Sequence, residues 1–294
     1  MQFGYLSLND AQGIRPDVLA RSVEERGFDS VWLPEHSHIP ASRRTPYPNG
    51  GELPDGYYHN MDPFVSLALA AGATTTLTLA TGVCLLLEHD VLALACTTAS
   101  LDVLSGGRLL LGVGVGWNEE ELENHRPDVP FRLRYSAMRE RVAALRTAWS
   151  EDIASFEGRW DRFEPAHIYP KPVQSSIPVA LGNAGKLGIR HAAEYADHWC
   201  PIDAGVLNTT GRPDVAGGIA LFRDLAADAG RDPAEIPISF FAWGRPPRSR
   251  IESYAELGVD RIVVSPPSFT RHDEAETMRW LDGWADTVAE LSQG

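Results

Sequence analysis

The sequence predicts a (β/α)8 barrel with a long loop after its second strand, formed by a single domain over residues 1–294. Eight short runs rich in β-branched and aromatic residues recur along the chain, and segments with helical periodicity lie between them. Nearly continuous apolar runs are typical of parallel strands covered by helices, and eight strand–helix repeats favour closure into a barrel. A doubly wound open sheet is the competing architecture.

The eight predicted strands are, in order, QFGYLSL (2–8), DSVWLP (29–34), LTLATGV (77–83), RLLLGVG (108–114), IPVALG (177–182), ADHWCP (196–201), PISFFAW (237–243) and DRIVVS (260–265). Asp62 and Pro63 are expected to be the N-cap and first-turn proline of a helix through FVSLALAAGA. Helical spacing predicts two further apolar faces, formed by Met138, Val142, Leu145 and Trp149, and by Met278, Leu281, Ala285, Val288 and Leu291.

Residues 37–63 are the one long segment whose density of Pro, Gly and polar residues opposes regular structure over most of its length. Loops this long in a compact domain are usually lids, binding loops or disordered excursions. We predict that residues 37–60 form a mobile cover over the candidate site. Arg43 and Arg44 either contact an acidic ligand there or are exposed surface arginines.

Composition narrows the class of function. The net charge is −14, and no run rich in Lys or Arg is present, so neither a nucleic acid nor an anionic membrane is an expected partner. The N-terminus lacks a signal-peptide pattern and no segment reaches membrane-spanning length, so we expect a cytoplasmic protein. Cys84, Cys96 and Cys200 form no CxxC pattern, which argues against disulfides and structural zinc.

The most reactive side chains follow the second predicted strand. In a parallel barrel, the loops after the strands meet at the C-terminal end, where substrates bind. Glu35 and His36 in VWLPEHSHIP therefore point to a site at this end, although a helix cap or a solvated loop would have the same pattern. A metal site formed with His38 is not predicted, because no further ligand cluster at suitable spacing is visible.

Glycines interrupt two of the strands. Gly82 in TGVCLLLEHD allows a bulge or a close backbone approach, or is one small residue in a packed strand. Gly112, Gly114 and Gly116 alternate at the end of RLLLGVGVG, which leaves space on one face for a planar ligand or for close packing inside the barrel. The order GVGVGW lacks the GxGxxG dinucleotide fingerprint.

The segment GNAGK, residues 182–186, lies between a predicted strand and a helix. Backbone N–H groups of a Gly-rich turn at a helix N-terminus stabilise an anion, and Lys186 would add positive charge. A tight connection also favours Gly and Asn without any ligand. We predict that this turn binds a phosphate, and a purely structural turn is the alternative.

Together these stretches resemble the bacterial luciferase-like monooxygenase superfamily, and specifically its deazaflavin F420-dependent branch. The resemblance covers nearly the whole chain and rests on GFDSVWLPEH, LATGV, ASLDVLSGGRLLLGVGVGWNEEE, VALGNAG and ADHWC. It implies a (β/α)8 barrel that binds a flavin-type cofactor at its C-terminal face. It also implies a non-prolyl cis peptide, which we predict joins Gly82 and Val83 and forms a bulge behind the cofactor ring.

The resemblance assigns roles to residues at four strand ends. Glu35 would lie close to the cofactor ring, and His36 would face the reacting centre. The strand-three bulge carries over to Gly82, Val83 and Cys84, the strand-four end to Gly114, Val115, Gly116 and Trp117, and the phosphate cradle to Gly182, Asn183, Ala184, Gly185 and Lys186. Trp117 replaces the glutamate that acts as general acid in the F420-dependent glucose-6-phosphate dehydrogenases, which argues against a sugar-phosphate substrate.

The residues and the resemblance together are compatible with three functions. The first is an oxidoreductase that moves a hydride between C5 of F420 and an organic small molecule, with Glu35 or His36 handling the companion proton. The second is an FMN-dependent monooxygenase, and the third is a non-catalytic protein that binds F420 or flavin. The substrate and the oligomeric state, including a homodimer, stay open from the sequence.

Overall fold

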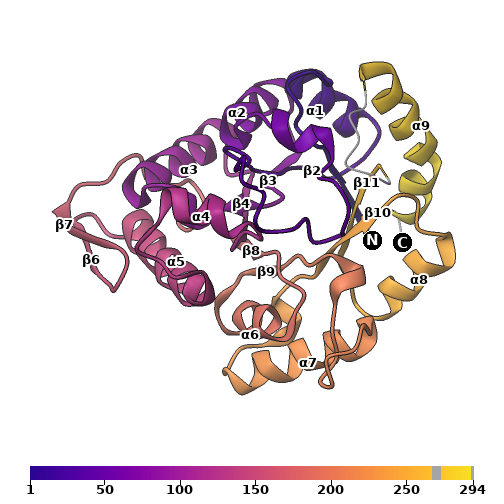
Figure 1. Cartoon of the computed structure of the whole chain (residues 1–294). Helices are drawn as coiled ribbons and strands as arrows, with labels where there is room; N and C mark the ends of the chain where they lie inside the picture. The colour runs from indigo at the N-terminus through magenta and orange to yellow at the C-terminus, as the bar shows by residue number, and fades with distance from the viewer. Residues whose placement is uncertain (267–272, 293–294) are drawn as a thin grey trace.

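The computed structural model describes residues 1–266 and 273–292. Within these residues, eight parallel strands follow one another around the molecule in the order β10-β11-β1-β2-β3-β5-β8-β9 (Figure 1). The strands are β1 (Gln2–Leu6), β2 (Ser30–Leu33), β3 (Thr78–Thr81), β5 (Leu109–Gly114), β8 (Val179–Leu181), β9 (His198–Trp199), β10 (Ser239–Trp243) and β11 (Arg261–Ser265). Each lies within one of the eight predicted runs.

The sheet closes on itself. Parallel bridges pair Trp199 with Ile238 and Ile202 with Phe241, which joins the β9 end of the sheet to β10. The predicted barrel is therefore confirmed, and the open doubly wound sheet is wrong. One departure lies at β3, where the run continues after an interruption as the short strand β4 (Cys84–Leu85), paired with β5.

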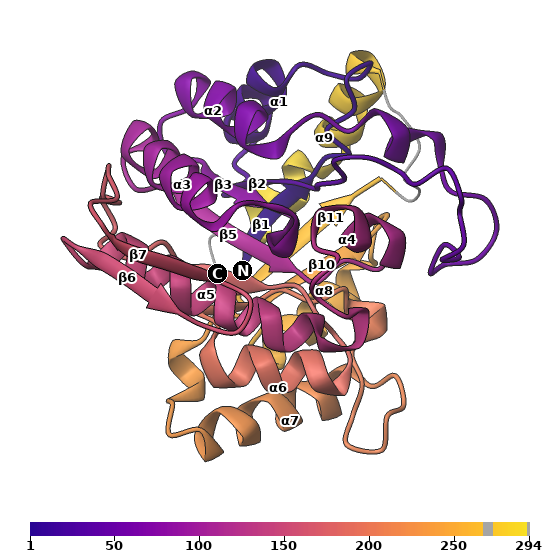
Figure 2. The same cartoon turned by 60° about the vertical axis from the view of Figure 1, so that its left-hand side comes forward.

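Helices surround the barrel (Figure 1). They are α1 (Pro16–Glu25), α2 (Pro63–Ala73), α3 (Val91–Ser105), α4 (Glu119–His125), α5 (Arg134–Ser150), α6 (Lys186–Tyr195), α7 (Val215–Asp228), α8 (Arg248–Glu256) and α9 (Glu274–Leu291). Short 3-10 turns are η1 (Asp55–His59), η2 (Leu86–Glu88), η3 (Phe131–Leu133), η4 (Asp203–Gly205) and η5 (Pro233–Glu235), and β6 (Ala154–Glu157) pairs with β7 (Arg162–Ala166) in a hairpin that projects from the barrel (Figure 2). In the described residues, no helix has the length and apolar character needed to span a membrane.

Local sequence patterns account for α2, α5 and α9. The Asp62 carboxylate accepts a hydrogen bond from the Val65 amide at 2.9 Å, and Pro63 occupies the first turn of α2, as predicted. The predicted apolar face of α5 is buried at all four positions. In α9, Leu281 and Val288 are buried, and Met278, Ala285 and Leu291 are partly buried.

The barrel interior is filled by side chains. Seven barrel strands contribute one residue each, and the residue after β9 supplies the eighth: Leu6, Trp32, Ala80, Leu110, Ala180, Cys200, Phe241 and Val263. Gly4 makes room for the largest of them, because a Cβ atom there would lie 2.8 Å from Nε1 of Trp32. A filled interior leaves the C-terminal end of the strands, where the βα loops meet, as the place for a ligand.

Candidate active site

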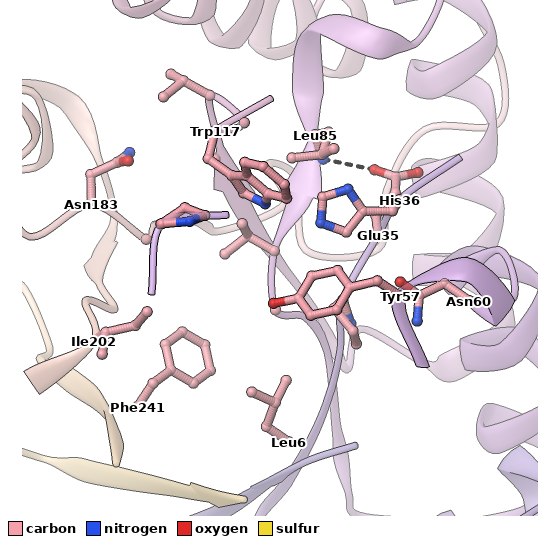
Figure 3. A pocket seen from close by; sticks show the side chains of 18 of the residues that line it. Leu6, Glu35, His36, Tyr57, Asn60, Leu85, Trp117, Asn183, Ile202 and Phe241 are labelled. Atoms are coloured by element: carbon pink, nitrogen blue, oxygen red, sulfur yellow. Dashed lines mark hydrogen bonds between the residues drawn. The ribbon is translucent and has the colours of Figure 1, made fainter. Parts of the chain in front are cut away.

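An apolar pocket of about 320 Å³ opens at the C-terminal end of the barrel strands (Figure 3). Its walls come from the ends of β1, β2, β3, β5, β8 and β10 and from the long segment after β2. The lining residues are Leu6, Leu8, Pro34, Glu35, His36, Pro48, Tyr57, Asn60, Gly82, Val83, Leu85, Gly114, Val115, Gly116, Trp117, Gly182, Asn183, Ile202, Phe241 and Trp243. Ten of the fourteen site residues expected from the sequence therefore line one pocket.

The other four expected residues lie elsewhere. Cys84 is fully buried beside Glu35 and does not line the pocket. Ala184, Gly185 and Lys186 lie beyond the pocket, at the N-terminus of α6. Lys186 is the first residue of this helix and is exposed.

The peptide bond between Gly82 and Val83 is cis, as predicted, and it lies between β3 and β4. The neighbouring glycines make space for this bulge: a Cβ on Gly114 would lie 2.5 Å from Val83 Cγ2, and one on Gly182 would lie 2.7 Å from Val83 Cγ1. A Cβ on Gly112 would lie 1.9 Å from the Thr81 carbonyl oxygen. Of the two interpretations of the alternating glycines, close packing applies to Gly112 and Gly114, since protein atoms fill the space beside them.

Glu35 is buried and held from two sides. Its Oε2 accepts a hydrogen bond from the Leu85 amide at 2.7 Å (Figure 3), and its Oε1 lies 2.8 Å from His89 Nε2. Burial disfavours the charged form, but the hydrogen bonds from His89 and Leu85 outweigh it, so the pKa of Glu35 is below its ordinary value. The same pairing outweighs burial at His89 and raises the pKa of that imidazole. Glu35 and His89 therefore stabilise each other's charged forms.

His36 presents its other edge to the pocket. Its Nδ1 lies 2.9 Å from Oε2 and 3.0 Å from Oε1 of Glu121, a carboxylate on α4 that is fully buried. The imidazole lies between the rings of Trp117 and Tyr57, with centroids 5.9 and 5.2 Å away (Figure 3). The hydrogen bonds of His36 to described residues all involve Nδ1, so Nε2 is available to a ligand. A carboxylate that fixes Nδ1 orients a histidine for proton transfer at Nε2.

The cluster around Glu35 also has metal-like spacing. Ligand atoms of Glu35, Cys84 and His89 lie within 4.8 Å of one another. Both oxygens of Glu35 already accept hydrogen bonds, and burial raises the pKa of the Cys84 thiol well above its ordinary value, which opposes the thiolate form that binds metals. We therefore interpret Glu35, Cys84 and His89 as a hydrogen-bonded cluster and assign no metal to it.

The GNAGK turn offers unsatisfied donors. Asn183 lines the pocket, and its Nδ2 is buried without a hydrogen-bond partner among the described residues, while its Oδ1 accepts from the Tyr135 hydroxyl at 3.3 Å. Gly185 is the N-cap of α6 and provides no side-chain cap. A Cβ on Gly185 would have no atom within 4 Å, so open space lies in front of the helix N-terminus.

The long segment after β2 lies at the mouth of the pocket, to which it contributes Pro48 and Tyr57. It is tied to α4, because the Thr45 amide donates a hydrogen bond to Glu120 at 3.0 Å. Arg44 is exposed and pairs with Glu120 and Glu123, so it is occupied by the protein itself. Arg43 has its guanidinium carbon 5.8 Å from the Trp117 ring. The placement agrees with a cover; its mobility stays a prediction.

Sequence reasoning missed several site residues. Glu121, which fixes His36, lies in the run NEEE, where three consecutive glutamates look like a solvated first turn of a helix. Glu121 is the third residue of α4 and is buried, but its burial depends on how the folded helix packs, so the sequence pattern alone does not predict it. Leu6, Phe241 and Trp243 lie at the ends of predicted strands, so the barrel prediction itself could have placed them at this mouth.

Known proteins are similar to this chain in sequence and in fold. The chain is 37% identical over 279 residues to an uncharacterized protein of Mycobacterium tuberculosis, covering 94% of this chain and 95% of the relative. It is 28% identical over 246 residues to the F420-dependent hydroxymycolic acid dehydrogenase of Mycobacterium tuberculosis, covering 83% of this chain and 59% of that enzyme.

Among solved structures, an F420-dependent secondary alcohol dehydrogenase in complex with an F420-acetone adduct superposes with a TM-score of 0.75 at 19% identity, covering 97% of both chains. That similarity shows the fold. Residues 1–277 match the family described as luciferase-like monooxygenase. The chain therefore belongs to the luciferase-like monooxygenase family.

Proposed function

We propose that this chain is an F420-dependent oxidoreductase that transfers a hydride between C5 of the deazaflavin and an organic substrate in the apolar pocket. One observation carries the proposal: the pocket brings together an apolar floor at Val83 and the free Nε2 of His36. The characterised relatives among the proteins compared above are F420-dependent dehydrogenases, which supports the choice of cofactor.

The residues present fit such a cofactor. Val83 and the glycines beside it line the pocket with small apolar groups that suit a ring, and the unpartnered Nδ2 of Asn183 with the uncapped N-terminus of α6 suits an anionic tail. When bound, a deazaflavin supplies a ring carbon that accepts or donates a hydride. The protein's own contribution is to position the two reactants and to exclude water.

We assign the companion proton to His36 rather than to Glu35. The Nε2 of His36 is free, whereas both oxygens of Glu35 are already hydrogen-bonded. Glu121 keeps the proton of Nδ1 in place, so that neutral His36 accepts at Nε2 when an alcohol is oxidised and imidazolium donates there when a carbonyl is reduced. Glu35, paired with His89, holds the lining residue Leu85 in place through its backbone amide.

Turnover with F420 tests the proposal. Secondary alcohols, starting with 2-propanol, are supplied with F420, and ketones, starting with acetone, with reduced F420; the change in ring absorbance is followed. We expect turnover with wild type and a loss of about 100-fold in kcat with His36→Gln. Oxygen consumption with reduced FMN would instead support a monooxygenase, and tight F420 binding without turnover on any electrophile would support a carrier.

A further inference from the structure

The active-site pocket presents no charged partner to a substrate. Among the residues that the structure describes, no Lys, Arg or Asp side chain lines this pocket. Its one carboxylate belongs to Glu35, whose two oxygens are engaged by the Leu85 amide at 2.7 Å and by His89 Nε2 at 2.8 Å. The guanidinium carbon of Arg43 lies 5.8 Å from the Trp117 ring, but Arg43 does not line the pocket. An ionised group of a substrate would therefore meet neither a Lys or Arg side chain nor a free carboxylate.

The polar side chains of the pocket add no net charge. Tyr57, Asn60 and Asn183 line it and are neutral at pH 7. A positive charge on His36 is balanced by Glu121, whose Oε2 lies 2.9 Å from His36 Nδ1. The Nε2 of His36 is therefore suited to one neutral oxygen of a substrate, in a hydroxyl or a carbonyl group.

Leu6, Ile202 and Phe241 form an apolar wall of the same pocket. A Cβ on Gly82 would lie 3.0 Å from Leu6 Cδ1 and 3.5 Å from Phe241 Cζ, so this wall borders the bulge after β3. Ile202 extends the wall, because it pairs with Phe241 in a parallel bridge. Figure 3 shows the three side chains on the opposite side of the pocket from His36. Ile202 is 39% exposed, so hydrocarbon bound against it would remove apolar surface from water.

We propose that the substrate is an uncharged alcohol or ketone whose hydrocarbon body lies against Leu6, Ile202 and Phe241 and whose reacting oxygen faces His36. This inference names the substrate class of the site and rests on the proposed function. An anionic substrate is rejected, because burial of a carboxylate without a cationic partner is costly. The net charge of −14 adds a repulsion of anions at longer range.

Three matched ketones test the proposal: 2-pentanone, 4-oxopentanoate and methyl 4-oxopentanoate. The second has a carboxylate where 2-pentanone has its terminal methyl group, and the methyl ester keeps the added size without the charge. Ligand-observed NMR measures the binding of each ketone to cofactor-free protein, and kcat/KM is measured for each with reduced F420.

Two variants of one residue test the position of the wall. Ile202→Lys places a cation among the apolar side chains, and the exposure of Ile202 gives the longer side chain room. Ile202→Gln is the matched control, because it adds polarity without charge. If the hydrocarbon body lies against Ile202, only the lysine variant should improve the binding and the reduction of 4-oxopentanoate relative to 2-pentanone.

At pH 7 we expect wild type to bind and reduce both neutral ketones, with kcat/KM for 4-oxopentanoate lower by about 100-fold or more. We expect Ile202→Lys to narrow this gap by about tenfold or more and Ile202→Gln to leave it unchanged. Binding of the carboxylate as tight as that of the neutral ketones, no binding of either neutral ketone, or an unchanged gap in Ile202→Lys would each overturn the proposal. The NMR measurement needs no F420, so absence of turnover with all three ketones would count against the proposed function, and the order of binding would still decide this inference.

Discussion

Replacing Glu88 by glutamine should make the protein more stable at neutral pH, by an amount that grows with pH. Burial, together with the negative charges of Glu121 and Glu35, raises the pKa of Glu88 to about 9 in the folded state, against 4.5 for an ordinary glutamate. A raised folded-state pKa contributes stability that is fully present below the unfolded pKa and is lost as the pH rises to the folded pKa. Wild type therefore loses this contribution between pH 4.5 and about 9, whereas glutamine has no proton to lose.

The size of this loss of stability follows from the interval between the unfolded pKa of Glu88 and the pH of the measurement. From the unfolded pKa of 4.5 to pH 7, at about 1.36 kcal/mol per pH unit, the loss amounts to roughly 3 kcal/mol. Urea unfolding of wild type and Glu88→Gln, at several pH values between about 5 and 8, measures the difference in the free energy of unfolding. We expect a small difference at the acid end and roughly 3 kcal/mol near pH 7 in favour of the variant. Parallel curves for the two proteins would refute the assignment of a neutral Glu88.

Three further substitutions test the pocket. Gly114→Ala should cost about 1 to 3 kcal/mol of stability, because its Cβ would lie 2.5 Å from Val83 Cγ2, and Val83→Ala in the same chain should recover part of that loss in thermal unfolding. Gly185→Val should weaken F420 binding by about tenfold or more with a stability cost of about 1 kcal/mol, since its side chain enters open space in front of α6; equal losses of affinity and stability would return the turn to a structural role. Arg44→Ala should leave F420 affinity unchanged in a fluorescence titration, because Arg44 already pairs with Glu120 and Glu123.

The barrel could be predicted because parallel strands that are buried on both faces have nearly continuous apolar sequences. All eight barrel strands fall within apolar runs such as LTLATGV and RLLLGVG. The hairpin of β6 and β7 was not predicted, since its residues alternate weakly and five of the nine are exposed. Its pairing depends on contacts outside the barrel repeat, which the strand–helix pattern does not describe.

From the sequence, a site residue could be predicted only where its place in the barrel topology puts its side chain in the pocket. Glu35 and His36 follow β2 after Pro34 alone, so the topology places them at the mouth of the pocket. The partner of His36 could not be found in the same way: Glu121 lies 85 residues away, in a glutamate-rich turn that resembles a solvated surface. Glu88 was hidden for a similar reason, because its raised pKa depends on burial and on the charges of Glu121 and Glu35, and only the folded chain brings these about.

The proposed function depends most directly on the identity of the ring that the pocket binds. A parallel titration of the protein with F420 and with FMN, read from the fluorescence of each ring, measures this without a known substrate. We expect saturable binding of F420 at lower concentration than FMN, and we expect Gly185→Val to weaken this preference. Binding of FMN in preference to F420, or no binding of either ring, would contradict it.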